Sequence, residues 1–187
     1  MPIEIEKKYR LTQARRRKIE ERLRAIGASP RPVELEENTL YNGGRLDFGG
    51  CALRLRRVND RAILTFKRRF PSASPIKHQQ EEETQVSDAD AANAILSALG
   101  FRPALIYEKR RTRWKVGNAE VTMDELPFGL FMEIEAPEKD IARVEKLLHL
   151  EDLPAVIETY PTLTANLGKE RKGIIEARFK KARRRRS

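Results

Sequence analysis

The sequence predicts an α+β domain in which eight antiparallel β-strands close into a barrel flanked by about three main helices. Eight segments alternate apolar and polar residues with the period of a β-strand, whereas three have the spacing of an amphipathic helix. Several neighbouring strand segments are separated by only a few Gly, Asn, Asp or Pro residues, and such short links join antiparallel strands. At 187 residues the chain is long enough for one sizeable domain.

The predicted helices are bounded by residues that begin or end helices. Thr12 can cap the first helix, whose apolar residues follow helical spacing up to Gly27. The second helix is expected at about residues 88–99, and the third starts near Pro137 and ends before Pro154. The strands are expected at residues 3–10, 33–41, 52–58, 62–68, 79–86, 105–116, 120–124 and 130–135.

The net charge of +10 belongs mainly to the C-terminus. Residues 169–187 contain ten Lys or Arg and two Glu, whereas residues 1–168 contain 28 basic and 26 acidic residues. We therefore expect one domain over residues 1–168 and a basic tail over residues 169–187 that is partly disordered. Such a tail can make weak contacts with nucleic acid or another polyanion through its charge.

The composition also indicates in which cellular compartment the protein is expected. The sequence has no apolar run near the roughly eighteen residues that a membrane-spanning helix needs, and no charged-then-apolar leader. Cys51 is the single cysteine, so an internal disulfide is excluded. We expect a cytoplasmic protein with no membrane partner, and both a monomer and a homodimer remain open.

Charged residues share one face of strand after strand. Glu4, Glu6 and Lys8 lie on one face of the first strand, because successive side chains of a strand point to opposite faces. The same alternation recurs at Arg54 and Arg56, Thr65 and Lys67, Glu81 and Glu83, Lys109, Arg111 and Arg113, Thr122 and Asp124, and Glu133 and Glu135. In a closed barrel with the helices outside, these faces would line the interior. The alternative is an open sheet whose charged face is solvated and held by cross-strand ion pairs.

The charges are sorted by sign, and this sorting favours a binding site. Some strands present only acids on the charged face and others only bases, which a solvated face does not require. Arg and Lys neutralise phosphate oxygens, and carboxylates hold Mg²⁺ or Mn²⁺. The pattern therefore predicts a site for a polyanion and a divalent metal.

Eight short motifs carry a resemblance to a known family. In chain order they are E-x-E-x-K at residues 4–8, L-R-L-R at 53–56, T-F-K at 65–67, E-x-E at 81–83, E-K-R-R at 108–111, V-T-M-D at 121–124, F-M-E-I-E at 131–135 and E-T-Y at 158–160. The chain resembles the CYTH domains, also called triphosphate tunnel metalloenzymes. That superfamily includes class IV adenylate cyclases and thiamine and inorganic triphosphatases.

The resemblance implies an eight-stranded tunnel that holds a small-molecule triphosphate and one or two divalent cations, Mg²⁺ or Mn²⁺. By position, the phosphate-binding residues would be Lys8, Arg54, Arg56, Lys67, Lys109 and Arg111. The metal-binding residues would be Glu4, Glu6, Asp124, Glu133 and Glu135, with Glu81 and Glu83 as further ligands. Catalytic roles would fall to Lys8, Lys67 and Tyr41. For each of these residues the alternative is an ion pair within the tunnel.

Two positions depart from the family's pattern. Members commonly carry Asp-x-Tyr-Tyr/Phe-Asp on the second strand, where residues 38–42 of this chain read N-T-L-Y-N. Only Tyr41 could serve in the Lys–Tyr base proposed for some members, and strand alternation could point it away from the tunnel. An Arg often found just before E-x-E is replaced by Gln79. The general triphosphate pattern is kept, whereas the element that selects the reaction is altered.

Three functions follow from these patterns. The first is a metal-dependent phosphohydrolase that releases phosphate from inorganic, nucleoside or thiamine triphosphate. The second is a class IV adenylate cyclase that converts ATP to cyclic AMP and pyrophosphate. The third, from another class, is a non-catalytic module that binds polyphosphate or nucleic acid. We favour hydrolysis. The shared phosphate site fits either reaction, because positioning and neutralising charge supply most of the catalysis of phosphoryl transfer.

Overall fold

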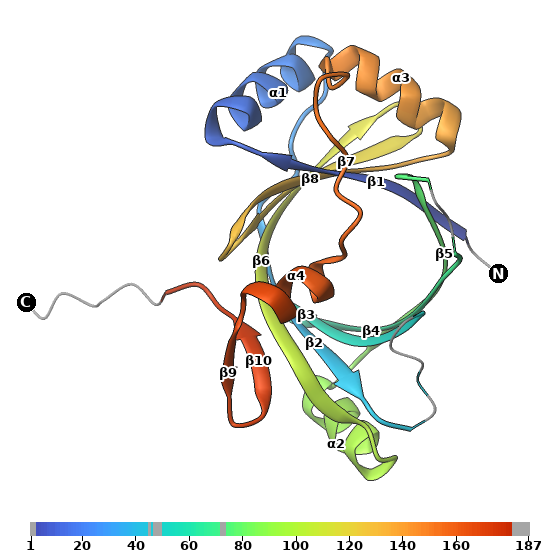
Figure 1. Cartoon of the computed structure of the whole chain (residues 1–187), viewed down its shortest axis with the longest axis vertical. Helices are drawn as coiled ribbons and strands as arrows, with labels where there is room; N and C mark the ends of the chain where they lie inside the picture. The colour runs from blue at the N-terminus through green and yellow to red at the C-terminus, as the bar shows by residue number, and fades with distance from the viewer. Residues whose placement is uncertain (1–2, 45, 47–49, 72–73, 181–187) are drawn as a thin grey trace, which may run out of the picture.

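The eight predicted strands close into an antiparallel barrel. The computed structural model describes residues 3–44, 46, 50–71 and 74–180. The barrel strands are β1 (Ile3–Leu11), β2 (Glu34–Asn42), β3 (Cys51–Val58), β4 (Arg61–Arg69), β5 (Lys77–Val86), β6 (Arg102–Val116), β7 (Ala119–Leu126) and β8 (Gly129–Glu135). Their order is β2-β3-β4-β5-β1-β8-β7-β6, and the pairing of β2 with β6 closes the ring (Figure 1). The predicted fold class is confirmed.

Three helices cover the outer face of the barrel, as predicted. Helices α1 (Gln13–Ala25) and α3 (Glu138–Leu148) lie together on one side, and α2 (Ala89–Ala98) lies on the opposite side (Figure 1). Ile19 of α1 and Ile141 of α3 are fully buried in an apolar cluster that includes outward-facing residues of β7 and β8. Burial of such an apolar stripe is what stabilises an amphipathic helix on a sheet. Among the described helices, none combines the length and the apolar character that crossing a bilayer requires.

A fourth helix, α4 (Tyr160–Leu167), lies at one mouth of the barrel and is absent from the sequence prediction. The hydroxyl of Thr159 accepts a hydrogen bond from the backbone N–H of Thr162 at 3.2 Å and so caps the helix. Figure 1 shows α4 within the outline of the ring. Because the helix has only eight residues, its sequence is too short for a reliable 3.6-residue period.

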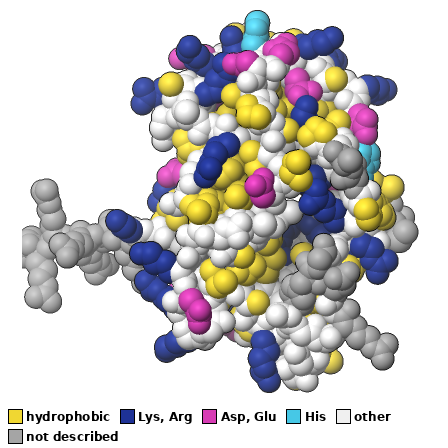
Figure 2. Space-filling view, in the orientation of Figure 1, with side chains coloured by type: hydrophobic (Ala, Val, Ile, Leu, Met, Phe, Trp, Pro, Cys, Tyr) yellow, Lys and Arg dark blue, Asp and Glu magenta, His cyan; other side chains and the backbone are white. Residues whose placement is uncertain are grey.

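A C-terminal hairpin extends the sheet into the segment predicted as a tail. Strand β10 (Ile174–Ala177) pairs with β9 (Lys169–Arg171) and runs parallel to β6. Arg178 forms ion pairs with Glu37 and Glu108, and so fastens the end of the hairpin to the outer barrel wall. Figure 2 shows Lys and Arg side chains along this edge of the molecule. The last basic run, residues 181–187, lies outside the described residues, and the predicted contact with nucleic acid stays a prediction.

Charged side chains fill the interior of the barrel, whereas its outward faces are apolar. Val121 of β7 and Ile134 of β8 point outward and are fully buried under the helices. The charged residues exposed by 8% or less, apart from Asp140 of α3, are Lys8, Glu36, Arg56, Lys77, Lys109, Asp124 and Glu133. A buried charge is costly unless an opposite charge or hydrogen bonds satisfy it, so the arrangement of these partners decides what the tunnel can bind.

Candidate functional site

A cavity of about 890 Å³ runs through the barrel and is lined by residues of all eight strands and of α4. All of the predicted phosphate-binding residues line it, and so do all of the predicted metal-binding residues except Asp124. Side chains far apart in the sequence therefore meet in one place, as the strand alternation predicted. The roles of these side chains depend on how they are paired.

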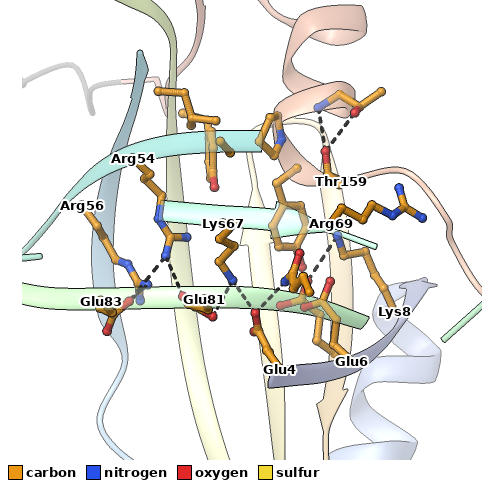
Figure 3. Close-up of a pocket in the computed structure, with 18 of the residues that line it drawn as sticks. Glu4, Glu6, Lys8, Arg54, Arg56, Lys67, Arg69, Glu81, Glu83 and Thr159 are labelled. Atoms are coloured by element: carbon orange, nitrogen blue, oxygen red, sulfur yellow. Dashed lines mark hydrogen bonds and ion pairs between the residues drawn. The ribbon is translucent and has the colours of Figure 1, made fainter. Parts of the chain in front are cut away.

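A row of cations follows strands β3 and β4 along one wall of the cavity (Figure 3). Lys67 Nζ donates to Glu4 Oε2 at 2.6 Å and lies 2.9 Å from Glu81 Oε2. Arg56 Nη2 lies 3.1 Å from Glu83 Oε2, and Arg54 Nη2 lies 3.8 Å from Glu81 Oε1. Each cation of the row thus pairs with a carboxylate of the nearby strands β5 or β1, and the row can accept a polyanion when these pairs exchange partners.

A second group of cations lies on β1 and β6. Arg111 donates to Asp124 through Nε at 2.7 Å and contacts Glu133 through Nη2 at 2.5 Å. Lys8 Nζ lies 3.2 Å from Glu133, and Lys109 Nζ lies 3.4 Å from Asp124. Burial, reinforced by the nearby positive charge of Arg111, lowers the pKa of Lys109 to about 8. Although burial alone would raise the pKa of Glu133, the neighbouring Lys8 and Arg111 hold it below its ordinary value.

Asp124 lies inside the barrel, but the structure does not bring it to the cavity surface. Its carboxylate is 1% exposed, accepts two hydrogen bonds from Arg111 and accepts one from the hydroxyl of Tyr160 at 2.8 Å. The observed arrangement supports an ion pair that orients Arg111 and holds α4, rather than the predicted metal ligand.

Tyr41 lies outside the tunnel. Its hydroxyl donates a hydrogen bond to Asn93 of α2 at 2.8 Å, and its ring is buried with Leu55 and Leu96 under that helix. The physical reason is strand alternation, because Leu40 points into the cavity and its neighbour must point out. This placement corrects the prediction for Tyr41 and does not support a catalytic role for it.

Glu36 and Tyr160 are among the tunnel residues that were not assigned a role from the sequence. Glu36 of β2 is fully buried, with carboxylate oxygens 3.2 Å from Lys109 Nζ and 3.9 Å from Arg56 Nη1. It could have been found by extending the alternation two residues back from Asn38. Tyr160 places its ring 3.8 Å from Lys8 Nζ and lines the cavity from α4. Tyr160 belongs to the E-T-Y motif, but no periodic pattern around it indicates which way its side chain points.

Glu135 lies near other carboxylates that line the same cavity. Burial raises the pKa of Glu135 to about 7, and the nearby charges of Glu4 and Glu120 add to the shift. Burial also raises the pKa of Glu4, and a hydrogen bond with Glu81 contributes. In the part of the chain that is described, no three acidic, His or Cys side chains stand where one metal ion could bind them all. The donor chemistry nevertheless fits Mg²⁺ or Mn²⁺, since both prefer carboxylate oxygens and would relieve this repulsion.

The raised pKa of Glu135 predicts a pH-dependent stability in metal-free buffer. The folded protein binds this proton more tightly than the unfolded chain, whose carboxyl has the ordinary pKa of 4.5. Stability contributed by protonated Glu135 is therefore lost as the pH rises through about 7. We expect the free energy of unfolding of wild type to fall relative to that of Glu135→Gln between about pH 5 and about pH 8. Parallel curves in chemical denaturation would show that the carboxyl is not perturbed.

An antiparallel barrel whose cavity is lined by rows of cations and neighbouring carboxylates defines a tunnel protein that holds a charged ligand. Comparison with protein families identifies it more closely. The family model described as the CYTH domain matches residues 2–153, which is most of the chain. The chain belongs to the CYTH domain family.

Individual relatives agree with this assignment. A protein of Methanocaldococcus jannaschii, described as a candidate adenylate cyclase, is 29% identical over 150 residues, which cover 78% of this chain and 83% of that protein. A solved structure from Pyrococcus horikoshii has a TM-score of 0.73 at 23% identity and covers 84% of this chain and 96% of its own. A candidate adenylyl cyclase from Hippeastrum, reported to have a dominant triphosphatase activity, has a TM-score of 0.63 at 20% identity, covering 83% and 90%. The two structures show that the fold is shared.

Proposed function

We propose that this protein is a divalent-metal-dependent phosphohydrolase that acts on a triphosphate. The observation that carries the proposal is the row formed by Arg54, Arg56 and Lys67, which follows one wall of the cavity beside the carboxylates of β1 and β5. Three cations in a row suit a linear anion with several phosphate groups better than a single phosphate. The Hippeastrum neighbour adds support, because a triphosphatase activity has been reported for that protein.

In this proposal the protein positions the anion and neutralises its charge. Arg54 and Arg56 turn from Glu81 and Glu83 to bind phosphate oxygens. Lys8 of β1 binds a further phosphate oxygen. Mg²⁺ or Mn²⁺, held by carboxylates such as Glu4 and Glu135, would neutralise phosphate oxygens and lower the pKa of a bound water. The oxygen of the attacking water forms a bond to the terminal phosphorus, the bond from that phosphorus to the bridging oxygen breaks, and the water proton passes to solvent. The products are phosphate and the diphosphate that remains.

A second candidate is an adenylate cyclase. Besides the charged row, the cavity has an apolar part lined by Leu40, Ala52, Leu105 and Pro161, where the organic portion of a nucleoside triphosphate could pack. The relative from Methanocaldococcus jannaschii is described as a candidate for this activity. In this reaction the ribose 3′-oxygen bonds to the α-phosphorus, the bond from that phosphorus to the bridging oxygen breaks so that pyrophosphate leaves, and the hydroxyl proton passes to solvent.

Product analysis separates the two candidates. Purified protein incubated with tripolyphosphate and Mg²⁺ or Mn²⁺ is expected to release phosphate, and removal of the metal with EDTA is expected to abolish the release. A parallel incubation with ATP and the same metals is analysed for cyclic AMP and for phosphate. Cyclic AMP without phosphate release from either compound would favour the cyclase. Turnover of neither compound would contradict the enzymatic proposal.

A further inference from the structure

The ammonium group of Lys67 lies between two carboxylates on neighbouring sides of the cavity. Its Nζ donates to Glu4 Oε2 at 2.6 Å and lies 2.9 Å from Glu81 Oε2 (Figure 3). Gln79 Nε2 donates to the same oxygen of Glu4, also at 2.6 Å. All of these side chains are largely shielded, with exposed fractions of 22% for Lys67, 18% for Glu81 and 12% for Glu4. The Lys67 ammonium is therefore the cation that the two carboxylates share.

A divalent cation would need the same oxygens. Mg²⁺ and Mn²⁺ bind carboxylate oxygens directly, and an ammonium within hydrogen-bond distance of those oxygens opposes them by its volume and its like charge. Among the described residues, no set of three acidic, His or Cys side chains is arranged as a metal site. Lys67 thus occupies the position beside Glu4 and Glu81 that a metal ion would need.

A triphosphate would offer Lys67 a different partner. Lys67 lines the same cavity as Arg54 and Arg56, so an anion seated on this row lies within reach of its side chain. Phosphate oxygens form strong charge-assisted hydrogen bonds with an ammonium. When Lys67 moves to the anion, Glu4 and Glu81 lose their shared cation. Glu135 of the adjacent strand β8 lines the same cavity, and so a set of carboxylates becomes available.

We propose that Lys67 is an internal counterion that blocks the carboxylates until a triphosphate draws it away. The divalent cation and the triphosphate then bind cooperatively, and each raises the affinity of the protein for the other, because coupling between two binding sites is reciprocal. The protein selects the metal–triphosphate complex and binds neither free metal nor metal-free triphosphate tightly. This inference rests on the proposed function for the identity of the anion.

Binding of Mn²⁺ alone tests the blocking role without any turnover. Free Mn²⁺ is measured by electron paramagnetic resonance during titration of wild type, Lys67→Met and Lys67→Arg, with and without a non-hydrolysable imido analogue of tripolyphosphate. Wild type is expected to bind Mn²⁺ at least about tenfold more tightly when the analogue is present. Without the analogue, Lys67→Met is expected to bind Mn²⁺ at least about tenfold more tightly than wild type, and Lys67→Arg to behave like wild type.

A matched control uses Lys18→Met, which removes the same charge from an exposed position on α1, outside the barrel. Its Mn²⁺ affinity is expected to equal that of wild type. Equal Mn²⁺ affinities of Lys67→Met and wild type would overturn the proposal. If Lys67→Met does not fold, the measurements on wild type still test the proposal. A Mn²⁺ affinity of wild type that a bound analogue does not change would also overturn the proposal. Failure of the proposed function is distinct: calorimetry with Mn²⁺ present would then show that the analogue does not bind, while the gain in Mn²⁺ affinity of Lys67→Met persists.

Discussion

Replacing Arg54 with methionine is expected to lower kcat/KM for tripolyphosphate by about 10- to 150-fold. Arg54 occupies the middle of the cavity wall, and its side chain is only 14% exposed, so water cannot take its place easily. A charge-assisted hydrogen bond contributes about 1.5–3 kcal/mol, and each 1.4 kcal/mol corresponds to about a tenfold change in rate. Steady-state phosphate release at saturating Mg²⁺ gives the value for each variant.

Arg57→Met is the matched control for this variant. Arg57 belongs to the same strand but points outward, where it pairs with Asp90 of α2 at 2.6 Å. The substitution removes an equal charge within three residues of Arg54 without altering the cavity. We expect its kcat/KM to stay within about twofold of wild type, because exposed ion pairs contribute little. Equal activities of Arg54→Met and Arg57→Met would show that the row does not bind the substrate.

Replacing Arg111 with methionine is expected to destabilise the fold by about 3–5 kcal/mol. The guanidinium contacts both Asp124 and Glu133, whose exposed fractions are 1% and 7%. Without Arg111, two buried carboxylates lose their principal partner, although Lys8 and Lys109 remain close to them. The free energy of unfolding is measured by chemical denaturation near neutral pH.

The neighbouring residue provides the control for this stability effect. Arg110 pairs with Glu125 at 2.9 Å on the outer surface, and the two side chains are 45% and 37% exposed. Since surface ion pairs contribute about 0–1 kcal/mol, Arg110→Met is expected to cost less than about 1 kcal/mol. A loss for Arg111→Met as small as that for Arg110→Met would mean that the buried network is not held together by this side chain.

The strands and the closure of the barrel could be predicted from the sequence because period-two alternation is a direct consequence of backbone geometry. Glu4, Glu6 and Lys8 alternate with Ile3 and Ile5, and the observed strand β1 extends only one residue beyond its predicted range. Helix α4 and the hairpin β9–β10 could not be predicted in the same way. They are short, and they are stabilised by contacts with the finished barrel, such as the hydrogen bond from Tyr160 to Asp124.

Most residues of the candidate site could be predicted from the same alternation and from the motifs. How deeply each side chain is buried could not be predicted in this way. Asp124 faces inward as expected, but Arg111 and Tyr160 cover it, and only the packing of the complete tunnel reveals this. Tyr41 matched a motif position but lies on the outward face of its strand. Glu36 was missed because the second strand departs from the family's pattern near Asn38.

The most direct test of the central claim, that the tunnel binds a triphosphate, is a crystal structure with Mn²⁺ and the imido analogue of tripolyphosphate. We expect the phosphate groups to lie within hydrogen-bond distance of Arg54, Arg56 and Lys67, with the anomalous signal of Mn²⁺ beside Glu4. An analogue bound only outside the barrel, with the tunnel ion pairs intact, would contradict the claim.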